Sequence, residues 1–359
     1  MPSYMGKGIA MNSMRARIVD CVAVALVFGA LLAVTEARAQ ASTKAAAKKT
    51  LVVASDGTGK YKTVQEAIDA APAGNVRIEI KPGEYRQVLS ITANGVELRG
   101  LGARPEDVVL VYDNSAGTAG GTGKSGSVSV TGDDFYAENL TISNDFEKRH
   151  ERSEQGSQAV ALLLTGDRAV LRRVRLLGYQ DTLYASSKSC HGAGDTGACH
   201  ASRQYFVDSY IAGHVDFIFG DAKAVFDHCE IHGMAHSMVT ITAQSRLRPE
   251  EDSGYLFRDS TVTADAGAEN ILLGRPWRDY ATVVFINTDF KAPLNPTAWL
   301  EWGGRLKTSD YAESGSHGLA GDVTLRVASS RQLTAAEAAK DTTRAWLAGA
   351  DGWNPEAVR

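Results

Sequence analysis

Three polar clusters interrupt strand-like apolar segments and carry the groups best able to do chemistry. They are Gln158-Ala-Val-Ala-Leu162, Gly178-Tyr-Gln-Asp-Thr-Leu-Tyr184 and Val215-Asp-Phe-Ile-Phe-Gly220. The carboxylate of Asp216 stands directly before Phe-Ile-Phe and would lose solvation there, so it should be paired or functional. A fourth cluster, Leu273-Gly-Arg-Pro-Trp277, adds a guanidinium beside an aromatic ring. Any one cluster alone is explained by a structural hydrogen bond or ion pair, but together they indicate a site.

Other motifs point away from the commoner chemistries. Gly123-Lys-Ser125 lacks the glycine of a phosphate loop, because Thr118 stands at that position. No G-x-S-x-G, HExxH or CxxC occurs, which argues against a nucleophile elbow and the usual zinc sites. His228 and His232 would lie about 13 Å apart on an extended strand, too far to share an ion. We therefore expect no metal and no cofactor.

The strands that must hold these clusters repeat along the chain. A six-residue pattern recurs along the chain. It has an apolar residue at the first position, a polar residue at the third and an apolar residue at the sixth. The copies are Phe206-x-Asp208-x-x-Ile211, Phe226-x-His228-x-x-Ile231, Phe257-x-Asp259-x-x-Val262 and Phe285-x-Asn287-x-x-Phe290, with weaker ones at Ala137-x-Asn139-x-x-Ile142 and Leu171-x-Arg173-x-x-Leu176. One short strand per irregular coil is typical of a solenoid of stacked parallel coils. An antiparallel sandwich would need denser turns, and a doubly wound fold would need helices, of which none is predicted between Ser127 and Phe290.

Helices are expected only at the two ends of this all-β domain. Thr63 and Glu66 form a capping box for a helix that Pro72 ends, and this helix should cap the open end of the stack. Thr334 and Glu337 open a second helix, predicted to reach about Leu347, in a tail packed along the solenoid.

The N-terminal 39 residues have the organisation of a secretory signal. Arg15 and Arg17 precede an apolar run, and Ala37-Arg-Ala39 offers a cleavage site near Ala39. We predict a signal peptide over 1–39, a linker over 40–50 and a single domain over 51–359. The protein would then be secreted or periplasmic. The net charge of -4 gives no reason to expect nucleic acid or an anionic membrane as a partner.

Two of the three cysteines beyond the signal flank a short loop. In an oxidising compartment we interpret Cys190 and Cys199 as a disulfide, the alternative being two free thiols on a flexible loop. Cys229 is left over and is expected to be buried.

The four clusters, in this order, resemble the signature segments of the pectin methylesterase family. Gly83-Glu-Tyr85, Thr242-Ala-Gln-x-Arg246 and the tryptophans of the tail resemble it too, and the resemblance covers roughly residues 50–355. It implies a right-handed parallel β-helix. Gln87, Ser245 and the charged stretch Phe146 to Gln155 depart from the family pattern, which leaves substrate detail open.

The resemblance also implies a role for each site residue. Asp216 is the nucleophile, Asp181 the general acid and then base, and Gln180 the oxyanion stabiliser. The remaining side chains would bind the substrate: Gln158, Arg275, Trp277, Ser127, Tyr184 and Phe219. The expected reaction is removal of C6 methyl esters from methyl-esterified pectin (polygalacturonate), giving pectate and methanol, by a protein expected to be a monomer.

Two other classes of protein remain open at this point. One is another pectin-acting β-helix enzyme, either a lyase or a galacturonase. The other is a catalytically silent carbohydrate-binding or surface protein of the same fold. Intact Asp181, Asp216 and Arg275 argue against the silent protein, and the Gln180-Asp181 pair suits neither a lyase nor a galacturonase.

The pairing of Gln180 with Asp181 makes a geometric demand. Adjacent residues on a regular strand point to opposite faces, so both cannot face one groove unless the chain leaves the strand. We therefore expect Asp181 at or just beyond a strand boundary, with its carboxyl a few Å from that of Asp216.

Overall fold

The structure is a computed structural model that describes residues 48–150, 156–188 and 199–358. The predicted signal peptide, most of the predicted linker and Cys190 lie outside the described residues. Lys48–Arg359 forms one compact unit. Its first strand begins at Lys49, two residues before the predicted start of the domain.

In the described residues, all pairings between the strands named below are parallel. The pairings form three ladders. The first ladder comprises β1 (Lys49–Val53), β2 (Val76–Ile80), β5 (Glu97–Gly100), β8 (Tyr136–Asn144), β10 (Ala169–Leu177), β12 (Arg203–Val207), β15 (Lys223–Asp227), β18 (Gly254–Arg258), β21 (Thr282–Ile286), β23 (Asp310–Ser314) and β25 (Arg331–Gln332).

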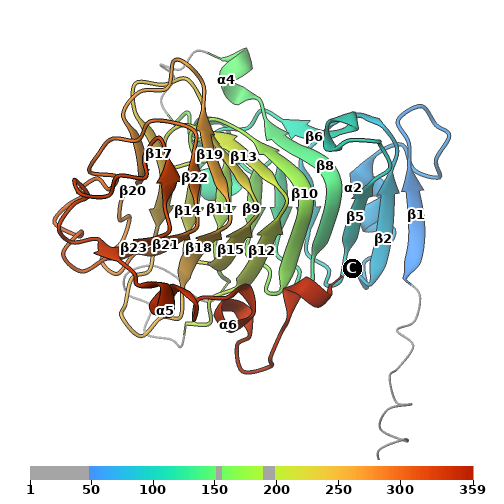
Figure 1. Cartoon of the computed structure of the whole chain (residues 1–359). Helices are drawn as coiled ribbons and strands as arrows, with labels where there is room; N and C mark the ends of the chain where they lie inside the picture. Colours follow the sequence, from blue (N-terminus) through green and yellow to red (C-terminus); the bar gives the residue numbers. More distant parts are fainter. Residues whose placement is uncertain (1–47, 151–155, 189–198, 359) are drawn as a thin grey trace, which may run out of the picture. The chain divides into compact units, whose positions relative to one another are not determined.

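The long strands β8 and β10 bend into the second ladder. It also includes β3 (Gly83–Arg86), β6 (Val108–Tyr112), β13 (Tyr210–Gly213), β16 (Glu230–Gly233), β19 (Thr261–Ala264), β22 (Asp289–Phe290) and β24 (His317–Gly318). The third ladder is β4 (Leu89–Ile91), β7 (Val128–Val130), β9 (Leu162–Leu164), β11 (Leu183–Ala185), β14 (Ile218–Gly220), β17 (Val239–Gln244) and β20 (Ile271–Gly274). Successive coils thus stack strand on strand, which confirms the predicted parallel β-helix (Figure 1).

The polar residue of the sequence repeat marks a corner of each coil. Asp208, His228, Asp259 and Asn287 all adopt left-handed backbone conformations, with φ between 47° and 53°. The weaker copies, Asn139 and Arg173, do the same. Asn and Asp tolerate this conformation better than most residues, because their short polar side chains can bond locally. The repeat therefore encodes the bend between the first and second ladders.

The apolar residue of the same repeat builds a column inside the coils. The rings of Phe206, Phe226, Phe257 and Phe285 stack in succession, with centroid separations of 4.8, 4.5 and 4.3 Å. All four side chains are fully buried. Parallel in-register strands bring equivalent residues of neighbouring coils into contact, so one residue type repeated every coil becomes a continuous core.

A short helix covers the N-terminal end of the stack, as predicted. Helix α2 (Val64–Asp69) has the capping box of Thr63 and Glu66 and packs its buried Val64, Ala67 and Ile68 into the main core. At the far end Trp299 is buried and stacks on Tyr311 with centroids 4.1 Å apart.

The C-terminal tail corrects one prediction. The capping box of Thr334 and Glu337 is present, but the helix it opens, α5 (Ala335–Ala338), is short. A second helix, α6 (Thr343–Leu347), begins after Thr342, whose side chain accepts the N–H of Ala345 and restarts the helix. Both helices lie along the first ladder (Figure 1), where α6 packs against β15 and Leu347 joins an outer apolar cluster.

Short helices also interrupt the coils, which corrects the prediction of no helix between Ser127 and Phe290. Helix α4 (Phe146–Arg149) lies within the charged stretch after β8. The other short elements lie outside that range: η1 (Pro105–Asp107), α3 (Ala116–Ala119), η2 (Thr122–Lys124) and η3 (Pro355–Ala357). None of the described helices has the length and apolar character needed to cross a membrane.

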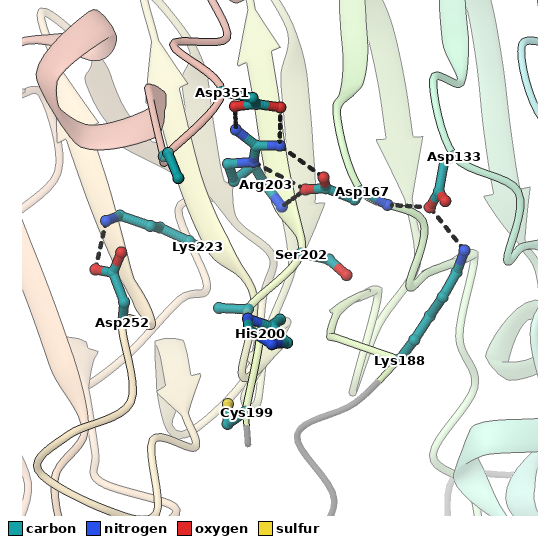
Figure 2. A pocket seen from close by; sticks show the side chains of 13 residues that line it. Asp133, Asp167, Lys188, Cys199, His200, Ser202, Arg203, Lys223, Asp252 and Asp351 are labelled. Atoms are coloured by element: carbon teal, nitrogen blue, oxygen red, sulfur yellow. Dashed lines mark hydrogen bonds and ion pairs between the residues drawn. The ribbon is translucent and has the colours of Figure 1, made fainter. Parts of the chain in front are cut away.

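Arg203 fastens the tail to the coils (Figure 2). Its Nη2 donates to Asp167 Oδ2 at 2.7 Å and to Asp351 Oδ2 at 2.9 Å, and its Nε donates to Asp167 Oδ1 at 3.0 Å. The same guanidinium lies 5.4 Å from the centre of the Trp353 ring. Arg203 thus joins a carboxylate of the coils, Asp167, to a carboxylate of the tail, Asp351.

Candidate active site

Asp181 and Asp216 lie at equivalent positions of neighbouring coils, just outside the third ladder. Asp181 stands between β10 and β11, and Asp216 between β13 and β14, with φ angles of 67° and 51°. Leu183 pairs with Ile218, and each aspartate precedes its strand residue by two positions. The left-handed conformation lets the chain leave the strand, and the predicted placement of Asp181 beside a strand boundary is confirmed.

The carboxylate of Asp216 is held on both oxygens. Arg275 Nε donates to Oδ1 at 2.9 Å and Nη2 donates to Oδ2 at 2.6 Å. Thr240 Oγ1 donates to Oδ1 at 2.8 Å and accepts the backbone N–H of Asp216 at 2.7 Å. Thr240 is fully buried and occupies the equivalent position of the next coil, since Ile218 pairs with Thr242. These contacts fix the direction in which Asp216 points.

Asp181 has the opposite electrostatic character. Its side chain is buried, and burial raises the pKa of this carboxyl well above its usual range. The negative charge of Asp216 raises the pKa further, while Arg275 opposes the rise. A carboxyl in this position retains its proton at pH values where an exposed aspartate has lost it. Burial and the neighbouring negative charge thus favour the protonated form of Asp181, the form that can donate a proton.

The two turns open into one cleft of about 330 Å³. It brings together eight of the nine predicted site residues with four others. Its lining is Thr122, Gly123, Gln158, Gln180, Asp181, Tyr184, Asp216, Phe219, Ala243, Arg275, Trp277 and Trp302. The backbone also links the amide-bearing segments, since Ala159 N donates to Gln180 O at 3.2 Å. Two carboxyls, two amides, a guanidinium and several rings thus share one opening.

Aromatic side chains line one wall of the cleft. Tyr184 and Phe219 stack with centroids 4.2 Å apart, in the register that pairs β11 with β14. Trp277 lies tilted against both, at 6.5 and 5.9 Å. Trp277 and Tyr184 remain partly exposed, whereas Phe219 is nearly buried and supports them from below. Flat partly exposed rings provide the surface on which a sugar ring can stack.

Trp302 is one of the four cleft residues that the sequence did not predict. The Arg275 guanidinium lies 4.2 Å from the centre of its ring. The indole thus supports the arginine that holds Asp216. No local pattern around Trp302 indicates this role, because the contact joins segments 27 residues apart without a shared strand motif.

Ser127 corrects the predicted set. Its side chain is fully buried, and its hydroxyl donates to the carbonyl of Tyr112 at 3.3 Å. It does not line the cleft. The residue precedes β7, so its hydroxyl faces the backbone of a neighbouring coil rather than the opening.

A second cavity, of about 540 Å³, lies where the tail meets the coils (Figure 2). Its cationic side chains already have carboxylate partners. Lys188 pairs with Asp133 at 2.6 Å, Lys223 pairs with Asp252, and Arg203 pairs with the two aspartates described above. The charges of Lys188, Lys223 and Arg203 are therefore balanced by neighbouring carboxylates, and they give no reason to infer a bound anion.

His228, at a coil corner, and His232, on β16, pair with neighbouring side chains. His228 Nδ1 lies 2.9 Å from Asp227 Oδ1, and with Asp259 these form a group close enough to share an ion. His232 instead contacts Thr263 and Asp265. His228 is exposed, and a surface group of this kind is common without any metal.

The remaining cysteines follow the predicted pattern as far as the described residues reach. Cys199 is disulfide-bonded, and its predicted partner Cys190 lies outside the described residues. Cys229 is buried as predicted, and burial raises the pKa of its thiol to about 12.

The fold and the cleft define a parallel β-helix protein with a paired-aspartate, arginine-anchored site. The family model described as Pectinesterase matches residues 50–350. The chain therefore belongs to the pectinesterase family. Among curated relatives, Pectinesterase 31 of Arabidopsis thaliana is 38% identical over 266 residues, which cover 70% of this chain and 76% of the relative.

Other relatives are longer than this chain. Probable pectinesterase/pectinesterase inhibitor 17 of Arabidopsis thaliana is 37% identical over 87% of this chain, but the match covers only 59% of that protein. The chain thus spans less than two thirds of the length of several curated relatives.

Solved structures share the fold. A pectin methylesterase from carrot is 29% identical and superposes with a TM-score of 0.74, covering 84% of this chain and 93% of its own. A pectin methylesterase crystallised with a hexasaccharide is 30% identical, with a TM-score of 0.69 and coverage of 85% and 98%.

Proposed function

We propose that this protein hydrolyses the C6 methyl esters of galacturonate units in pectin, through an acyl-aspartate intermediate. One observation carries the proposal: a doubly anchored carboxylate, Asp216, shares a cleft with Asp181, a buried carboxyl of raised pKa. Membership of the pectinesterase family and the likeness to solved pectin methylesterases support the substrate.

In the first step a carboxylate oxygen of Asp216 attacks the ester carbonyl carbon. Arg275 and Thr240 hold that carboxylate in one orientation, which lowers the entropic cost of reaching the reactive geometry. The amide of Gln180, assisted by that of Gln158, donates to the oxyanion that develops on the carbonyl oxygen.

Asp181 then supplies the proton that the leaving group requires. The tetrahedral intermediate collapses, the bond to methoxide breaks, and methoxide takes the proton of Asp181 and leaves as methanol. This leaves an acyl link between Asp216 and the C6 carbonyl. Asp181, now ionised, removes a proton from a water molecule, whose oxygen attacks the acyl carbon. The bond to Asp216 breaks, Asp216 leaves as a carboxylate, and the galacturonic acid formed gives its proton to solvent. Both aspartates return to their starting states.

Substrate binding, secretion and assembly complete the proposal. Trp277 and Tyr184 would stack on sugar rings on either side of the reacting unit, and one solved relative is a complex with a hexasaccharide. The residues at 1–39 would direct secretion to the periplasm or beyond. A monomer, with no nucleic acid or membrane partner and no metal or cofactor, remains our expectation.

Methanol release from methyl-esterified pectin is the test. We expect methanol in step with new carboxylate groups, without new reducing ends and without the ultraviolet absorbance of an unsaturated product. New reducing ends would instead indicate a galacturonase, and the absorbance a lyase. Binding of pectin with no reaction would leave the silent carbohydrate-binding protein as the answer and refute our proposal.

A further inference from the structure

A buried pair of side chains behind the catalytic turns has no part in the chemistry described above. His214 precedes Val215 and Asp216, and its Nε2 lies 3.0 Å from Oε1 of Glu147. Both side chains are only 4% exposed. Glu147 belongs to helix α4, in the charged stretch to which the family resemblance assigned no role.

The hydrogen-bond geometry of His214 indicates which ring nitrogen is the acceptor. Its Nδ1 accepts the backbone N–H of Val215 at 2.8 Å, so this nitrogen carries no proton. The proton of the neutral ring must then sit on Nε2, where it is donated to Glu147. Val215 is itself buried, and Nδ1 is the partner found for its N–H in the described residues. A buried N–H without an acceptor would be costly.

The peptide groups on either side of Val215 connect the two catalytic turns. His214 N donates to Tyr179 O at 3.0 Å, and Thr240 N donates to His214 O at 2.8 Å. Asp181 N donates to Val215 O at 3.2 Å. The orientation of these peptides therefore sets the position of the Asp216 turn relative to the Asp181 turn. The imidazole also stacks on His236, with ring centroids 4.4 Å apart, which leaves it little freedom to rotate.

We propose that Glu147 and His214 form a positioning pair that holds the nucleophile turn through the Val215 N–H. Helix α4 thereby acts on catalysis although neither Glu147 nor His214 lines the cleft. This inference rests on the proposed function for its kinetic consequence, while the contact itself stands on the geometry alone. Arg275 and Thr240 hold the Asp216 side chain, and the Glu147–His214 pair holds the backbone that carries it.

Matched substitutions separate positioning from folding. His214→Leu and His214→Asn are similar in size, but only the Asn variant places an oxygen near the position of Nδ1 to accept the Val215 N–H. We expect kcat to fall about 10-fold or more in His214→Leu, because small misplacements of a reacting group are costly. KM should change little, since the pair does not touch the cleft. His214→Asn should recover most of the loss.

Substitutions on the helix complete the set. Glu147→Ala should lower kcat in the same way, and Glu147→Gln, whose amide oxygen still accepts from Nε2, should restore it. Arg149→Ala is the control on the same helix, because Arg149 pairs only with Asp145 at the surface in the described contacts. It should leave kcat unchanged. Melting temperatures measured alongside show whether a loss of kcat merely follows a loss of stability.

The ring itself can be examined without activity. In the full chain labelled with ¹⁵N-histidine, and assigned by comparison with His214→Asn, we expect His214 in the neutral form protonated on Nε2. A ring protonated on Nδ1 would overturn the proposal, as would an unchanged kcat in His214→Leu or losses that simply track melting temperature. Absence of methanol release from the unmodified chain would refute the proposed function instead, and the tautomer would still test the contact.

Discussion

Asp181 and Asp216 occupy the same position in successive coils. Leu183 pairs with Ile218 in the third ladder, and each aspartate stands two residues before one member of this pair. Thr240 continues the column one coil further on. In-register stacking therefore places three residues that are far apart in sequence in one row, in which Asp181 and Asp216 line the cleft and the fully buried Thr240 holds Asp216. The register of a parallel solenoid is enough to bring the two carboxyls into one cleft. Each motif alone therefore gives little indication of the site, because the site forms only when the coils stack.

Thr240 offers a first test of this row. Its hydroxyl both donates to the Asp216 carboxylate and accepts the Asp216 N–H. Thr240→Val keeps the shape and removes both bonds, so kcat should fall about 10-fold, the equivalent of one or two net hydrogen bonds. Thr240→Ser keeps the hydroxyl and should retain most of the activity. Equal rates of methanol release from the two variants would remove Thr240 from this role.

The tryptophans should divide into two classes. Trp277 lines the cleft partly exposed, so Trp277→Ala should weaken the binding of pectin while lowering the melting temperature only modestly. Trp299 is buried against Tyr311, so Trp299→Ala should destabilise the fold by about 3–5 kcal/mol. A binding isotherm beside a thermal melt for each variant decides. A large loss of stability in Trp277→Ala with unchanged binding would make it a core residue.

Asp221 should make stability depend on pH. Burial raises the pKa of this carboxyl to about 6, against hydrogen bonds from Ser186 and Ser187 that lower it. Because the folded state binds the proton more tightly, the contribution of Asp221 is fully favourable below about pH 4 and is lost as pH rises through 6.

Asp221→Asn should remove that loss and raise the free energy of unfolding at pH 8 by roughly 3 kcal/mol, from a pKa difference of about two units. At pH 4 the variant should gain little. Denaturant titrations at both pH values provide the measurement. An equal effect of the substitution at pH 4 and pH 8 would show that ionisation of Asp221 is not its cause.

The predicted bridge between Cys190 and Cys199 has a direct readout. Closing so short a loop should contribute roughly 2–3 kcal/mol in the chain-entropy model. Alkylation of the unfolded, unreduced protein should modify Cys229 alone, and prior reduction should add two further labels by intact mass. Three labels without reductant, in protein taken from an oxidising compartment, would rule the bridge out.

The features that repeat from coil to coil can be predicted from the sequence. The repeated apolar-polar-apolar pattern predicts the stacked parallel strands, and the structure shows in addition that its phenylalanines form an interior column. The catalytic turn at Asp181 also follows from one stereochemical rule about adjacent residues. Longer-range contacts leave no such trace. The contact of Arg203 with Asp351 spans 148 residues, and neither partner lies in a repeat.

Other misses have the same origin. Trp302 reaches its partner from an irregular segment and Glu147 from a four-residue helix, and neither segment is long enough for spacing or periodicity to indicate direction. Ser127 is an error of the opposite kind, a residue that the resemblance assigned to the site but that does not line it. Its hydroxyl donates to the backbone carbonyl of Tyr112 instead. Side-chain direction in a coil depends on which neighbouring backbone needs a partner, and that is a tertiary property.

Asp216→Asn tests the central claim most directly. The amide has nearly the shape of the carboxylate and can still meet Thr240, but it cannot attack an ester. Methanol release from esterified pectin should therefore fall below detection, on the order of 10⁴-fold or more, in a variant whose circular dichroism and pectin binding match the unmodified chain. Methanol release near the unmodified rate from that folded variant would contradict the aspartate nucleophile and the mechanism built on it.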